Sequence, residues 1–214
     1  MRSVAPATVS AHPFASRDFV GGDAALDFVN TITGRDEAPR DWIASYPGLV
    51  EWAGLANLLP PDVLQTLAAE AERRPDEAAA ALVRAKALRE ALFSVLTDMI
   101  AGEAAQPDDL ALVRRHWLAG VAAHDLRSAG GRVVRQLDEA AVDLDLIAAI
   151  VAYRAVEHVL PTPPARLGMC SGPNCAWLFI DTSKAGRRRW CDMAVCGNTA
   201  KSRRFQARRA AGAT

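Results

Sequence analysis

All four cysteines of the chain lie in residues 170–196, CSGPNCAWLFIDTSKAGRRRWCDMAVC, and the residues before this stretch contain none. They form two pairs, Cys170 with Cys175 and Cys191 with Cys196, and each pair encloses four residues. Two close pairs separated by a loop of this length can converge on one tetrahedral zinc ion. Because four thiolates fill the coordination sphere of zinc, the spacing predicts one structural Zn²⁺ per chain, without an open position for catalysis.

The residues between the cysteines have the composition of a small metal module. Residues 171–174 are turn formers, as the loop between two ligands requires. The pattern then predicts a strand, a turn, a return strand and a helix, at residues 176–180, 181–186, 187–190 and 197–209. A knuckle, a hairpin and a helix in this order are typical of a treble-clef-like module. Four ordinary buried cysteines, or a redox pair, are the alternatives, but neither pair has the two-residue spacing of thioredoxin-like sites.

This stretch resembles the CGNR-type zinc finger. The resemblance rests on the four cysteines and on the runs at residues 176–181, 187–191, 196–198 and 201–205. The family has an arginine after the Cys-Gly-Asn run, whereas this chain has Thr199. The nucleic-acid contact or salt bridge of that arginine is therefore not carried over.

A second resemblance concerns residues 19–52, which contain Gly21-Gly22 and the run LDFVNT at residues 26–31. This segment is similar to the ABATE domain that accompanies such fingers. Proteins of this architecture are described as stress-induced transcription regulators. The resemblance implies a DNA-binding finger attached to a domain of unsettled role.

Apolar spacing predicts that the chain before the finger is mostly helical. Helices are expected near residues 23–31, 42–52, 60–71, 75–102, 107–121 and 144–160. Two short strands at residues 124–128 and 132–137 flank Gly130-Gly131, which predicts a hairpin.

We therefore expect a predominantly helical α+β fold, with a helical N-terminal body, a short β-hairpin and a C-terminal treble-clef-like zinc module. The expected parts are a flexible lead-in, a helical ABATE-like body, a proline-rich linker and the four-cysteine finger, at residues 1–18, 19–160, 161–166 and 167–214.

The formal net charge of zero hides an uneven distribution. Residues 165–214 have 10 basic and 2 acidic side chains, whereas residues 1–164 have 15 basic and 23 acidic ones. A basic tail on an acidic body predicts a polyanionic partner, here DNA, although mutual attraction of the two parts is an alternative. No apolar run approaches the roughly 18 residues that a membrane helix needs, and no signal pattern is present. We expect a cytoplasmic protein without membrane contact.

Basic residues around the cysteines are candidate nucleic-acid contacts, because exposed arginines bind phosphates in a bidentate manner. The candidates are Lys184, Arg187, Arg188, Arg189, Lys201, Arg204 and Arg208. At about 100° per residue, Lys201, Arg204 and Arg208 share one helix face, from which Arg203 points away. A merely solubilising surface is the alternative.

Asp27, Asn30 and Arg35 are candidate contacts for a small-molecule effector. Asp27 and Asn30 are about one helical turn apart and share a face. A buried hydrogen-bonded pair that orders the fold is an equally good interpretation. The sequence contains no nucleophile elbow, phosphate-binding glycine loop or zinc-protease motif, so we expect that the protein is not an enzyme.

These observations favour a transcription regulator that binds DNA through the finger, with a body that senses a small molecule or a partner. The alternative is a zinc-stabilised module for protein or RNA interaction, without sequence-specific DNA binding. The oligomeric state is open, and a homodimer is compatible with the sequence.

Overall fold

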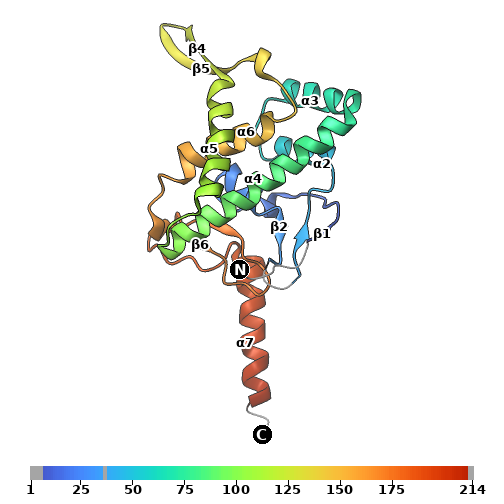
Figure 1. The fold of residues 1–214 in the computed structure, drawn as a ribbon. Coiled ribbons are helices and arrows are strands. Elements are labelled where there is room, and N and C mark those ends of the chain that lie inside the picture. The colour runs from blue at the N-terminus through green and yellow to red at the C-terminus, as the bar shows by residue number, and fades with distance from the viewer. Residues whose placement is uncertain (1–6, 36–37, 212–214) are drawn as a thin grey trace.

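The computed structural model describes residues 7–35 and 38–211, except for the side chains of Glu139, Arg204 and residues 207–211. Within these residues the protein is mainly helical, as expected (Figure 1). The helices are α1 (Ala24–Val29), α2 (Tyr46–Leu55), α3 (Pro61–Arg73), α4 (Pro75–Ala101), α5 (Pro107–Ala122), α6 (Leu146–Arg154) and α7 (Asn198–Ala211).

The strands of the described chain are short and form small separate sheets. They are β1 (Thr8–Val9), β2 (Ile32–Thr33), β3 (Arg40–Asp41), β4 (His124–Ala129), β5 (Arg132–Leu137), β6 (Leu167–Met169) and β7 (Leu178–Ile180). In the first sheet, β3 is the middle strand and pairs in parallel with β1 and antiparallel with β2. The other two sheets are the antiparallel pairs β4–β5 and β6–β7.

Local sequence signals set the helix boundaries. Asp23 caps α1 by accepting a hydrogen bond from the Ala25 N–H at 2.9 Å, and Ser45 caps α2. Proline occupies the first turn of α2, α3, α4 and α5, where its missing N–H has no partner to lose. Helix α4 ends at Gly102, whose φ of 72° favours glycine. The predicted helices are therefore present, although α2 begins at Tyr46 and not near Trp42.

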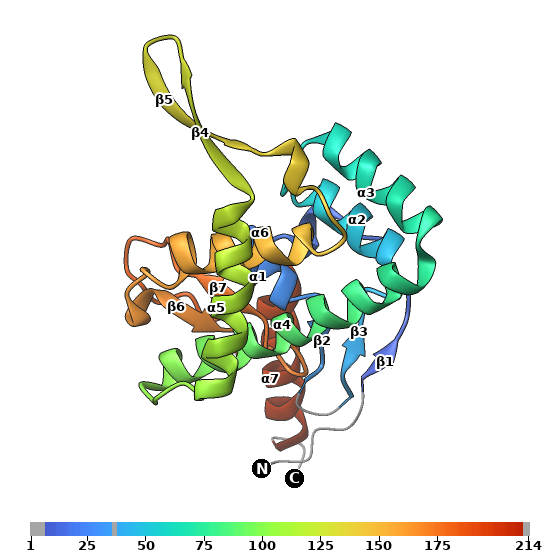
Figure 2. The same ribbon diagram turned by 45° about the horizontal axis from the view of Figure 1, so that its top comes forward.

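Helix α4 runs through the body and contacts α1, α2, α3, α5 and α6 (Figure 2). Among its buried apolar residues lies Arg89, only 2% exposed, which donates to the two carboxylate oxygens of Asp41 at 2.9 and 2.8 Å. Burial alone would raise the pKa of Asp41, but the hydrogen bonds and charge of Arg89 lower it below its usual value. This buried pair attaches β3 to α4, and Lys86 of α4 adds a second ion pair to the Asp41 carboxylate at 2.8 Å.

The predicted hairpin, β4–β5, stands away from the helical body (Figures 1 and 2). Its Leu126 and Val133 are 71% and 74% exposed. The base of the hairpin is attached through Tyr153 of α6, whose ring lies 4.6 Å from the Arg135 guanidinium carbon and 5.0 Å from the His124 ring.

The lead-in is more ordered than we expected from the sequence, although its residues 1–6 lie outside the described part. Strand β1 adds to β3, and Ser16–Asp18 form a 3-10 turn. The His12 and Phe14 rings contact Trp42, with centroids at 3.8 and 6.2 Å. These contacts hold the lead-in on the body.

The finger hairpin also differs from the expected one. Strand β7 pairs with β6, which precedes the first cysteine, so that Met169 faces Leu178. Residues 187–190 form no strand, because the Arg188 N–H donates to the Asp181 carboxylate at 2.8 Å instead of to a neighbouring strand. The first cysteine pair thus lies in the loop between the two strands.

Helix α7 follows the π-helical turn Met193–Gly197 and packs mainly on that turn. It extends from the finger away from the body (Figure 1). Across the described ranges, no helix is both long and apolar enough to cross a membrane.

Candidate functional site

The loop between Cys170 and Cys175 has the backbone that a metal knuckle needs. The Gly172 N–H donates to the Cys170 sulfur at 3.3 Å. A Cβ at Gly172 would lie 2.9 Å from the Cys196 sulfur, so only glycine fits there. Asn174 and Ala176 have φ values of 56° and 57°. These left-handed residues turn the chain so that both cysteines face the same centre.

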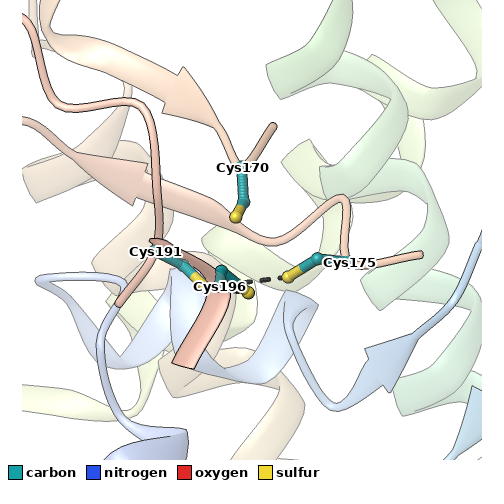
Figure 3. Close-up of side chains that lie close together, drawn as sticks. All are labelled: Cys170, Cys175, Cys191 and Cys196. Atoms are coloured by element: carbon teal, nitrogen blue, oxygen red, sulfur yellow. Dashed lines mark hydrogen bonds between the residues drawn. The ribbon is translucent and has the colours of Figure 1, made fainter. Parts of the chain in front are cut away.

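The four cysteine sulfurs converge on one point (Figure 3). All of them lie within 4.8 Å of one another, and the Cys191 sulfur is 3.6 Å from the sulfurs of both Cys175 and Cys196. Around tetrahedral zinc with bonds of about 2.3 Å, the sulfurs would be about 3.8 Å apart. The observed distances are close to this value and much longer than a disulfide bond. The donor set therefore fits one zinc ion with every position filled.

Without a cation between them, these buried thiols do not all lose their protons readily. Burial raises the pKa of the Cys196 thiol above its usual value, and the charge of the nearby Cys170 sulfur raises it further. Four thiolates so close together repel one another unless a cation lies between them. A zinc ion would supply the positive charge between the thiolates. It would also connect the two cysteine pairs, which lie before and after the loop of residues 176–190.

The finger is not an independent unit, because Asn30 of the body binds its strand β7. The Asn30 side-chain amide donates to the Leu178 carbonyl at 2.9 Å, and its oxygen accepts from the Leu178 N–H at 2.8 Å. Asn30 is 2% exposed and Leu178 is 1% exposed. The side chain thus replaces a neighbouring strand at the edge of β7.

Two further contacts join body and finger. The Trp177 indole N–H donates to the Ile32 carbonyl at 3.2 Å. The Ile180 N–H donates to the Gly21 carbonyl at 2.8 Å, while the Gly21 N–H donates to the Asp27 carboxylate at 2.8 Å. Burial raises the pKa of Asp27 to about 7, although the hydrogen bond from Gly21 opposes this shift.

The three residues predicted to contact an effector do not line one common site. Asp27 and Asn30 make the buried hydrogen bonds described above, which matches the structural interpretation left open by the sequence. Arg35 donates to the Glu90 carboxylate and to the Val29 carbonyl, and its guanidinium carbon lies 4.0 Å from the Phe93 ring centre. All three side chains are therefore engaged within the protein.

Arg188, one of the predicted DNA contacts, is also engaged within the protein. Its guanidinium donates to the carbonyls of Val20 at 3.0 Å and Ile180 at 3.2 Å, and also to that of Cys191. The guanidinium carbon lies 4.3 Å from the centre of the Phe179 ring. This side chain ties the loop before Cys191 to both parts of the molecule, which leaves it few donors for a phosphate.

Other predicted DNA contacts are open to solvent. Lys184, Arg187, Arg189 and Lys201 are exposed. Arg187 and Arg189 border a hollow of about 670 Å³ together with Trp190 and Met193. Arg204 and Arg208 belong to α7, but their side chains lie outside the described part of the structure.

A helical body that shares its packing with a four-cysteine finger defines a two-part zinc-finger protein. Comparison with protein families supports this class in both parts. Residues 22–162 match the ABATE family, described as "Putative stress-induced transcription regulator", and residues 166–209 match the CGNR zinc finger. Because the ABATE match covers more than half of the sequence, the chain belongs to the ABATE family and has a CGNR finger. A search of curated proteins found no match.

These matches confirm both resemblances seen in the sequence. They also confirm the cofactor prediction, since the CGNR finger coincides with the cluster of Cys170, Cys175, Cys191 and Cys196. The protein has one structural zinc site.

Proposed function

We propose that this protein is a transcription regulator that binds duplex DNA through its finger. In this proposal the body senses a small molecule or a partner and has no catalytic role. The ABATE family description supports regulation. A four-sulfur zinc site supports a structural finger, because it offers no position for a substrate.

The observation that carries DNA binding is the charge and position of α7. Its sequence has five basic residues and no acidic one. The helix extends away from the acidic body (Figure 1). An isolated helix of this length is only marginally stable in water, and its positive charges repel one another. A polyanion would relieve this repulsion, and the major groove of DNA is wide enough for a helix.

The loop before Cys191 adds charge beside this helix. Arg187 and Arg189 are exposed there, and the Arg189 guanidinium carbon lies 5.3 Å from the Trp190 ring centre. Arg188 is excluded from the proposed contacts, because its donors bind carbonyls of the protein. The proposed contacts are Lys184, Arg187, Arg189, Lys201, Arg204 and Arg208.

The test is titration of the zinc-loaded full chain with duplex DNA at several salt concentrations. If about six phosphates are neutralised, the slope of log affinity against log salt should be near −5. Arg187→Ala, Arg189→Ala and Lys201→Ala should each weaken binding on all sequences and reduce the slope by about one. Arg73→Ala, on the exposed end of α3, is the matched control and should change neither quantity.

A second function is favoured by the apolar surface at the start of α7. Met193 and Val195 are 50% and 53% exposed, which suits a protein partner. Unchanged duplex affinity in all three basic variants would reject the proposed DNA surface. Loss of partner capture in Met193→Ser, with DNA binding intact, would assign protein interaction to Met193, although this residue borders the same hollow as Arg187 and Arg189.

A further inference from the structure

A cavity of about 510 Å³ lies where the lead-in, the body and the zinc finger meet. This volume is within the range of small-molecule sites. Its walls include His12 and Asp18 from the lead-in, Trp42 from the body, and Trp177 and Asp192 from the finger. None of the three effector residues predicted from the sequence lines it. The cavity is therefore a new candidate site.

Aromatic rings form one wall of this cavity. The His12 imidazole stacks on the Trp42 indole with centroids 3.8 Å apart and planes at 13°. Trp42 in turn meets Trp177 edge to face, with centroids 5.4 Å apart and planes at 83°. Trp42 is only half-buried. His12 covers one face of Trp42, and the rest of this indole borders the cavity, where its π-electrons attract cations.

The charged groups around the cavity are mainly negative. Asp18 and Asp192 both line it, as do the zinc ligands Cys175, Cys191 and Cys196. Zinc bound by four thiolates has a net charge of about −2. Arg17 is exposed and supplies one positive charge, and the His12 ring lies 3.0 Å from the Asp18 carboxylate, which leaves Asp192 and the zinc ligands as the main negative groups. With zinc bound, the cavity is therefore electronegative.

We propose that this cavity binds a small organic cation, an ammonium ion with apolar substituents. The aromatic rings of Trp42 and Trp177 contact its apolar and cationic surface. The Asp192 carboxylate, with the zinc thiolates, provides the opposite charge, because the Asp18 carboxylate already accepts hydrogen bonds from the His12 ring at 3.0 Å and from the Ala15 N–H at 2.8 Å. An anionic ligand would meet repulsion from these groups, and an uncharged one would gain only the apolar contact.

The same cavity reaches the beginning of the finger helix. Val195 and Thr199 line it, and the Thr199 hydroxyl donates to the Val195 carbonyl at 2.9 Å. A bound cation would therefore contact the segment from which α7 starts. This second step rests on the proposed function, because it makes the cation an effector of DNA binding.

The test is calorimetric titration of the zinc-loaded full chain, without DNA, with three probes that share a phenyl ring and differ in charge. They are benzyltrimethylammonium, benzyl alcohol and benzoate. We expect binding of the ammonium ion and at least about tenfold weaker binding of the other two, as a cation–aromatic site requires. No binding of the ammonium ion, or equal binding of benzyl alcohol, overturns the proposal.

Two variants separate the charge and ring contributions. Asp192→Asn removes the charge but keeps an oxygen that caps the Val195 N–H, now bound at 2.9 Å. Asp192→Asn should lower the affinity for the ammonium ion about fivefold. Asp62→Asn, at the exposed start of α3, should leave this affinity unchanged. Trp42→Leu should lower the affinity for the ammonium ion about tenfold. Trp42→Phe should lower it less, because phenylalanine keeps an aromatic face. Equal affinities in Asp192→Asn and Asp62→Asn, with zinc content intact, overturn the charge argument.

Duplex titration with and without benzyltrimethylammonium tests the second step. A change in duplex affinity of at least about threefold supports coupling, and no change with the cation bound rejects it. Loss of duplex binding altogether refutes the proposed function, while the calorimetric result on the cation still decides the cavity.

Discussion

Asn30 joins the body to the finger through the two hydrogen bonds that it makes with Leu178. Asn30→Ala should lower the free energy of unfolding of the zinc-loaded chain by about 2–4 kcal/mol, because it leaves a buried N–H and a buried carbonyl without partners. Urea unfolding measures this change. Gln65→Ala, on an exposed position of α3, is the control and should stay within about 0.5 kcal/mol. An effect of Asn30→Ala as small as that of the control would show that water replaces the amide.

Asp27 should give the stability of the protein a pH dependence. Its pKa is raised by burial from 3.8 to about 7 in the folded state, so the folded chain retains a proton that the unfolded chain releases. Stability should therefore fall as the pH rises from about 4 to about 7, and should then level off. Asp27→Asn should remove this decline and leave the protein more stable than the wild type at pH 8.

Urea unfolding of both proteins at pH 5, 6, 7 and 8 checks this expectation. The upper bound of the Asp27 contribution is about 4 kcal/mol, at about 1.4 kcal/mol for each pKa unit. Asp62→Asn, which changes an exposed carboxylate, should keep the wild-type decline. Parallel curves for wild type and Asp27→Asn would mean that Asp27 is ionised in the folded protein.

At the residue scale, the sequence predicted the zinc ligands because the chemistry of zinc restricts both their type and their spacing. The roles of Asn30 and Arg188 were not predictable in the same way. Asn30 binds Leu178, and Arg188 binds Val20, so both partners are far away in the sequence. The sequence alone does not distinguish an arginine that binds carbonyls within the protein from one that is free to bind phosphate.

At the scale of elements, the helices were predictable because caps, prolines and apolar periodicity are local. The finger hairpin was not, because the partner of β7 is the three-residue strand β6, on the other side of the knuckle. The run of arginines at residues 187–189 resembled a return strand. Hydrogen bonds from Arg188 hold it as a loop instead.

The exposed hairpin β4–β5 should tolerate substitution. Leu126→Thr and Val133→Thr should each change the free energy of unfolding by less than about 0.5 kcal/mol, since both side chains are mostly in solvent. Leu88→Thr, in the buried part of α4, is the contrasting variant and should cost at least about 2 kcal/mol. Thermal unfolding of the three variants measures this difference. A large loss in either hairpin variant would mean that the hairpin is covered in solution, as in a homodimer.

At the scale of the whole molecule, the uneven charge predicted two parts but not how closely they pack. Leu167 and Leu178 of the finger belong to the same buried cluster as the apolar residues of the body. From the sequence we expected only a proline-rich linker, residues 161–166, between the body and the finger. The side-chain contacts that join them arise only in three dimensions and leave no periodic pattern in the sequence.

Because of this shared core, removal of zinc should weaken the body as well as the finger. A zinc chelator should lower the midpoint of thermal unfolding of the whole chain, with one transition for both parts. Calorimetry and far-ultraviolet circular dichroism both measure this unfolding midpoint. The control is the same chelator already saturated with zinc. A body transition that stays unchanged after chelation would show independent folding. For the same reason, point variants are better tests of DNA binding than a chain without its finger.

The arrangement of the zinc ligands also determines what a cut in the chain would do. Cys170 and Cys175 lie before the exposed loop that contains Lys184 and Arg187, and Cys191 and Cys196 lie after it. Trypsin acting after Lys184 should leave two peptides that remain together, because each keeps two bonds to the metal. Native mass spectrometry of the cut protein should show a single species with the mass of the intact chain plus one water molecule. Addition of a chelator should separate the two peptides. Continuity of the polypeptide would then be dispensable in this loop, which would make it a site for inserting a reporter sequence.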